Sequence, residues 1–162
     1  MVVNLFLWGL TAAMALVILI DTVRYLIPNT LNLAIFAMWV AAIFLLPIHG
    51  VPLALAAGVL VLLVGLGIFA IGLMGGGDIK LLAVLTLWTG WGTPTAQFLI
   101  LTAIVGGVLV VVTLIVRALA SALAGEKSLP RFLTRKQPVP YGIAIAGAFL
   151  IMLWRGQVPA LG

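Results

Sequence analysis

Long apolar segments occupy most of this chain, and they restrict its fold more than any other feature of the sequence. Hydrophobic residues make up 65% of the 162 residues and charged residues only 7%, whereas a typical soluble domain carries about 25% charged residues. A composition so poor in charge predicts a polytopic membrane protein that forms a single compact unit.

Turn residues divide the sequence into six apolar segments, which we expect to be transmembrane helices of an all-α domain covering residues 1–162. A helix needs about 20 apolar residues to span a membrane, and Pro and Gly mark most of the breaks. The first segment follows no basic residue and has no small-residue cleavage site, so it is expected to be a retained span. The six expected spans are approximately 3–20, 28–46, 51–73, 79–91, 96–116 and 139–157.

The fourth segment, 79–91, is too short to span a membrane as an isolated helix. Gly75, Gly76, Gly77 and Asp78 come directly before it, in "MGGGDIKLL". Irregular backbone at membrane depth is tolerated only inside protein or beside a water-filled cavity. We therefore expect a break at the glycines and a cavity next to it, whether the helix starts within the membrane or neighbouring loops dip inward.

Basic residues are distributed unequally between the two sides that six spans define. Seven lie on the side of Asp21 and Asp78, and only Arg155 lies on the other. The positive-inside rule then places the two acids at the cytoplasmic face of the cell membrane and both termini outside. Membrane lipids explain the net charge of +5 without any nucleic acid. The seven are Arg24, Lys80, Arg117, Lys127, Arg131, Arg135 and Lys136.

Asp21 and Asp78 are two of only three acidic residues, and both are expected at the edge of the bilayer. An ionisable residue at such a place marks function by default. The structural alternatives are a helix cap at either position, or pairing of Asp21 with Arg24. Two nearby carboxylates share a proton, so that one can activate a water while the other donates to a carbonyl oxygen. This is the chemistry of an aspartyl protease.

Residues beside the second acid can help to bind a substrate. Gly75, Gly76 and Gly77 permit the close approach of an extended peptide, although a flexible turn or close helix packing would also need them. Lys80 is a candidate for substrate contact, or alternatively a lipid anchor. The chain has no cysteine and a single histidine, His49, so we expect neither a metal site nor a cofactor.

Three blocks of the sequence resemble the type IV prepilin peptidases, which are GxGD intramembrane aspartyl proteases. "MGGGDIKLL" resembles their GxGDxKL block and places its acid at Asp78. "DTVRYLIPNTLNL", which begins at Asp21, resembles their first aspartate block. "VPYGIAIAG" resembles a late Pro-Tyr-Gly element at Pro140, Tyr141 and Gly142. The blocks occur in the family's order and extend over essentially the whole chain.

The resemblance implies that Asp21 and Asp78 are catalytic and remove the short basic leader from prepilin precursors at the cytoplasmic boundary of the membrane. Longer family members carry a cytoplasmic insert, often with zinc-binding cysteines, and also methylate the new terminus. This chain is similar to the short, peptidase-only form that serves Flp/Tad-type pili, and the pilus assembly machinery is a further implied partner. The candidate substrate-binding residues are Gly75, Gly76, Gly77, Lys80 and Tyr141.

Several alternatives remain open at this point. Archaeal preflagellin peptidases share the GxGD chemistry, whereas a proton-coupled carrier would use Asp21 and Asp78 as proton sites. A non-enzymatic subunit of a pilus machine would tolerate the loss of both acids. Tyr141 can also be an interfacial aromatic anchor, and Asn29 and Asn32 are expected to cap a helix or to form interhelical hydrogen bonds.

Overall fold

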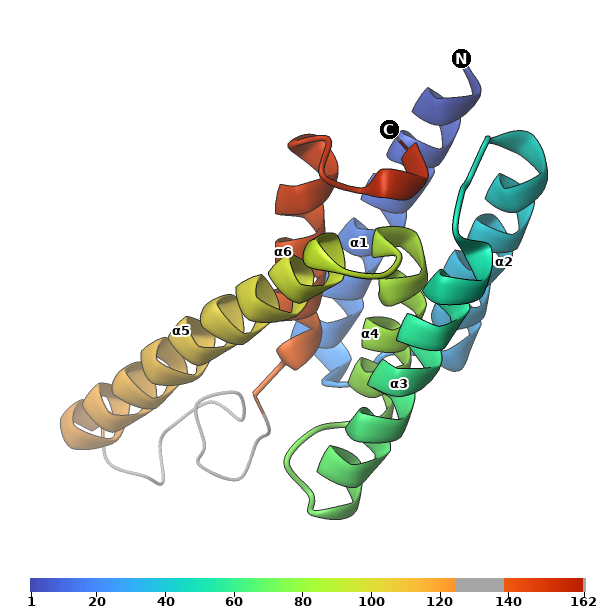
Figure 1. Cartoon of the computed structure of the whole chain (residues 1–162). Helices are drawn as coiled ribbons and strands as arrows, with labels where there is room; N and C mark the ends of the chain where they lie inside the picture. The colour runs from blue at the N-terminus through green and yellow to red at the C-terminus, as the bar shows by residue number, and fades with distance from the viewer. Residues whose placement is uncertain (125–138, 162) are drawn as a thin grey trace.

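The computed structural model describes residues 1–124 and 139–161, and over those residues the chain is all-helical, as predicted. Figure 1 shows a bundle of six α-helices in which both termini lie at the same end. Lys127, Arg131, Arg135 and Lys136, on which much of the predicted orientation depends, lie outside the described residues. The elements are α1 (Val2–Arg24), α2 (Asn29–Leu45), α3 (Val51–Ala70), α4 (Gly76–Thr89), α5 (Thr93–Ala124), α6 (Tyr141–Trp154) and the short 3-10 helix η3 (Pro159–Leu161).

Three of these helices are long and apolar enough to cross a membrane, namely α1, α3 and the part of α5 that covers Thr93–Ala122. The α2 and α6 helices are apolar but have only 17 and 14 residues, and α4 also has 14 residues. At 1.5 Å per residue, a 14-residue helix covers only about 21 Å. The structure thus supports a membrane protein, while six membrane crossings stay a prediction.

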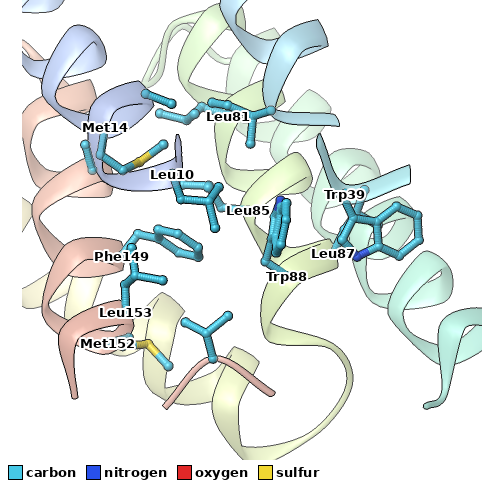
Figure 2. Close-up of a cluster of buried hydrophobic side chains, with 14 of the residues drawn as sticks. Leu10, Met14, Trp39, Leu81, Leu85, Leu87, Trp88, Phe149, Met152 and Leu153 are labelled. Atoms are coloured by element: carbon cyan, nitrogen blue, oxygen red, sulfur yellow. The ribbon is translucent and has the colours of Figure 1, made fainter. Parts of the chain in front are cut away.

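The short α4 helix lies at the centre of the bundle, where α2, α3, α5 and α6 pack against it. Its buried residues extend around the helix rather than along one stripe, which is typical of a core helix. Figure 2 shows Trp88 of α4 between Leu10 of α1 on one side and Trp39 of α2 on the other. Because other helices surround α4, its apolar side chains are buried by protein and not by lipid.

Small residues allow α3 to pack closely against α4. A Cβ atom added to Gly58 would lie 2.6 Å from Cδ2 of Leu87, and one added to Gly65 would overlap Ile79. Gly58 and Gly65 are seven residues apart and are both buried, as are the neighbouring alanines on that face. This is the small-residue packing by which helices associate within membranes, and it fixes the distance of α4 from α3.

The α5 helix diverges from the rest of the bundle. It packs mainly against α6 and at its beginning against α4, and Figure 1 shows its later part extending away from α3. Within the part of α5 that covers Thr93–Ala122, only 11% of the most apolar 18-residue stretch is buried. Large exposed side chains such as Val108, Leu114 and Ile115 lie along this part. A surface of this kind needs lipid or another apolar partner.

Candidate active site

Asp21 lies in the last turn of α1, at the point where the chain reverses direction. Tyr25 ends the helix in a left-handed conformation (φ 54°), and its N–H donates to the backbone oxygen of Asp21 at 3.0 Å. The Asp21 side chain is only 3% exposed. Its Oδ2 has no hydrogen-bond partner among the described residues. Since burial of a carboxyl oxygen without a partner is unfavourable, this oxygen adds nothing to stability.

The first turn of α6 makes room for the Asp21 carboxyl. A Cβ atom on Gly142 would lie 2.7 Å from Oδ2 of Asp21 and 2.9 Å from Cδ1 of Ile27. The backbone N–H groups of Gly142 and Ile143 face the carboxyl, at the helix end whose dipole attracts negative charge. The Pro-Tyr-Gly element therefore supplies backbone atoms to the surroundings of Asp21.

Asp78 lies in the first turn of α4. Gly75 is the N-cap and Gly76 the first helical residue, so the proposed alternative of an N-cap at Asp78 is wrong. The Asp78 carboxyl instead lies over Gly75, whose backbone N–H faces it, as an acid does when it reaches back in a capping box. The helix begins three residues before the expected start at 79, because the glycines form its cap and first turn.

Two of the three glycines in this turn have a neighbour very close to where a side chain would begin. A Cβ atom on Gly75 would lie 2.7 Å from Oδ2 of Asp78, and one on Gly77 would lie 2.9 Å from the backbone oxygen of Ile27. On Gly76 the nearest atom would be in Phe69 at 3.6 Å, which is an ordinary contact. The second glycine of the pattern thus has a direct steric cause, because backbone cannot readily yield, whereas a side chain at Gly75 would displace the Asp78 carboxyl.

Ile27 connects the surroundings of the two aspartates. It is buried, and it lies against Gly77 beside Asp78 and against Gly142 beside Asp21. The two carboxyl groups are close enough for their negative charges to repel each other. The structure therefore brings the acids of α1 and α4 to the same end of the bundle, opposite the two termini (Figure 1).

The other predicted substrate-binding residues lie around this end of the bundle. Lys80 is exposed, and its Nζ donates to Oδ1 of Asn29 on α2 at 2.9 Å. Asn32 of α2 donates from Nδ2 to the backbone oxygen of Gly77 at 3.2 Å, so interhelical hydrogen bonds were correctly expected for both asparagines. Tyr141 is the first residue of α6 and is half-buried. Its ring lies beside Gly106 of α5, 3.7 Å from the position that a Cβ atom on Gly106 would take.

An apolar cavity opens beside the first turn of α4. It has a volume of about 310 Å³ and lies between α3, α4 and α5. Met74 and Ile79, on either side of the glycine turn, belong to its wall, as do Val64 and Ile68 of α3. Its lining suits an apolar side chain or an acyl chain rather than a metal ion. Within the described residues, no cluster of three histidine or carboxylate side chains could hold a metal.

Comparison with known protein families complements this geometry. The sequence model of the type IV leader peptidase family matches residues 8–125, which is more than half of the chain. The chain belongs to this family. The matched part of the leader peptidase contains Asp21, Asp78 and Lys80 but ends before Tyr141. No curated protein and no solved structure matched the chain.

Two features of this leader peptidase were not predicted from the sequence. From the sequence, Gly142 was considered only as part of the Pro-Tyr-Gly element, whereas the structure places this residue against the Asp21 carboxyl. Ile27 was given no role beyond the first aspartate block. The presence of Gly142 at the beginning of a helix was the available signal, because a glycine there can leave room for a group from another helix.

Proposed function

We propose that this leader peptidase is an aspartyl endopeptidase that removes the short leader of type IV prepilin-like precursors at the cytoplasmic face of the inner membrane. One observation carries the proposal. Two of the three acidic residues of the chain, Asp21 and Asp78, come from separate helices, and the buried Ile27 lies between their surroundings, against Gly77 next to Asp78 and against Gly142 next to Asp21. Membership of a peptidase family supports peptide-bond hydrolysis as the reaction.

In the proposed mechanism the two carboxyls share one proton. The ionised carboxylate accepts a proton from a water molecule while the water oxygen bonds to the scissile carbonyl carbon. The protonated partner donates to the carbonyl oxygen. The carbon–nitrogen bond then breaks, the leaving amine takes up the proton that came from the water, and a hydroxyl of the intermediate returns a proton to the partner carboxyl as the new carboxylic acid forms. Of the three glycines, we assign Gly76 to the approach of the peptide backbone, because Asp78 and Ile27 occupy the spaces beside Gly75 and Gly77. We assign the apolar cavity to an apolar part of the substrate.

The experiment replaces each acid by its neutral isostere. Asp21→Asn and Asp78→Asn are purified in detergent and incubated with a prepilin-like precursor, and mass spectrometry identifies the new N-terminus. Loss of one general acid or base lowers a rate by roughly a hundredfold to ten-thousandfold, so leader removal should fall by that factor in each variant. Glu126→Gln, which changes the third acid of the chain, is the matched control.

Cleavage at the wild-type rate by either variant would disprove the two-aspartate assignment. An enzyme that cuts a preflagellin but no prepilin would establish the archaeal-type alternative. Proton flux across vesicles in the absence of any cleavage would favour the carrier, in which the same acids are proton sites.

A further inference from the structure

Two hydrogen bonds join the beginning of α2 to the beginning of α4. Asn32 donates from Nδ2 to the backbone oxygen of Gly77 at 3.2 Å, and Lys80 donates from Nζ to Oδ1 of Asn29 at 2.9 Å. On each helix the two residues are three positions apart and therefore lie on the same face. Two bonds at neighbouring turns restrict both the sliding and the rotation of α4 relative to α2.

The bond from Asn32 is the more important of the two. Asn32 is only 4% exposed, whereas the bond between Lys80 and Asn29 is exposed to solvent. A hydrogen bond is stronger in surroundings of low dielectric constant than in water. The backbone oxygen of Gly77 can only accept, so the amide group of Asn32 must direct its NH₂ toward it.

Stability alone gives little reason for an asparagine at this position. Oδ1 of Asn32 is buried and has no hydrogen-bond partner among the described residues. An apolar side chain of similar size would avoid that unpaired oxygen but would also give up the bond to Gly77, so the two effects on stability oppose each other. The amide is therefore better explained by what its NH₂ group holds than by its contribution to the core.

The held group directly precedes the acid of α4. Gly77 is the neighbour of Asp78 in the chain, and on its other side it lies against Ile27, which also contacts Gly142 beside Asp21. We propose that Asn32 is a positioning residue that fixes the first turn of α4, and with it Asp78, relative to Asp21, and that the bond between Asn29 and Lys80 supports it. The catalytic part of this proposal rests on the proposed function.

Kinetics and hydrogen exchange test the proposal together. Asn32→Leu keeps the size of the side chain and removes the donor. Because a misplacement of about 1 Å can reduce a rate about a hundredfold, we expect kcat for prepilin-like precursor to fall at least about tenfold. KM should stay within about twofold, since Asn32 does not bind the substrate. Asn32→Gln, which retains the amide, should recover part of kcat.

The exchange measurement reports on the turn itself and needs no substrate. The Ile79 amide donates to the backbone oxygen of Gly75 at 3.2 Å, and in Asn32→Leu it should exchange about tenfold faster. Amides later in α4 should be unchanged. Asn4→Leu replaces an exposed asparagine of α1 and is the matched control for both measurements.

Each outcome decides the matter. Unchanged kcat or unchanged exchange in Asn32→Leu overturns the proposal, and so does an effect on KM alone, which would indicate substrate binding. If leucine prevents folding, Asn32→Ala is measured in the same way, and loss of folding in both variants would make Asn32 a structural residue. Should the wild-type protein cleave no prepilin, the proposed function fails, whereas faster exchange at Ile79 would still establish the positioning contact.

Discussion

Glycine shapes the space around both proposed catalytic carboxyls. An oxygen of Asp78 lies 2.7 Å from where a Cβ on Gly75 would be, and an oxygen of Asp21 lies equally close to the corresponding position on Gly142. A sequence motif identifies such glycines but does not reveal which group fills the space beside them. For Gly75 that group is three residues away in the chain, whereas for Gly142 it comes from another helix.

Gly142→Ala tests this arrangement by adding a single methyl group next to the Asp21 carboxyl. The new Cβ would overlap Asp21 and Ile27, so Asp21 must move, and leader removal should become at least about tenfold slower. Gly147→Ala is the control in the same helix, since nothing lies within 4 Å of its added Cβ. Wild-type cleavage rates in Gly142→Ala, measured beside the control, would show that the position of Asp21 is not critical.

Helix α4 is short because it is enclosed by other helices. Its 14 residues are too few to span a membrane as an isolated helix, but in this structure its surroundings are mostly protein. Its start at Gly76 and the extension of α5 to Ala124, beyond the expected end at 116, reflect local sequence. Gly75 is a suitable N-cap residue for α4. The end of α5 is rich in alanine and leucine, which favour a helix, so the helix continues to Ala124.

Close packing between α3 and α4 should be sensitive to bulk at one position. Gly65→Leu would push Ile79 and the first turns of α4 away from α3, and overpacking of this kind lowers the free energy of unfolding by about 1–3 kcal/mol. Unfolding by SDS in mixed micelles measures the loss. Gly67→Leu places the same side chain on an exposed face of α3, where nothing lies within 4 Å, and should change stability little.

At the scale of the whole molecule, the two ends of the bundle carry different parts of the chain. Both termini lie at one end, and the turns that carry Asp21 and Asp78 lie at the other (Figure 1). The divergent α5 exposes a long apolar surface between these ends. This shape agrees with a protein that spans the bilayer and presents its acids at one face, and the positive-inside rule predicts that this face is the cytoplasmic one.

Single cysteines can test this orientation, because the chain contains none of its own. A membrane-impermeant maleimide added to intact cells, with any outer membrane removed, should label His49→Cys and Gln157→Cys. Leu26→Cys and Leu73→Cys should react only after the membrane is permeabilised. All four positions are exposed, so access to the reagent decides the labelling. Reaction of Leu26→Cys in intact cells would place the acids outside and exclude a cytoplasmic active site.

Composition and pattern by themselves determined that this is an all-helical membrane protein with two unusual acids. These properties are local, because an apolar segment favours a helix wherever it lies, and a carboxylate at the edge of a bilayer is unfavourable in any fold. The tertiary structure alone decided that Gly142 faces Asp21 and that Asn32 holds Gly77. Those partners are far apart in the chain, and only the packing of α1, α2, α4 and α6 brings them together.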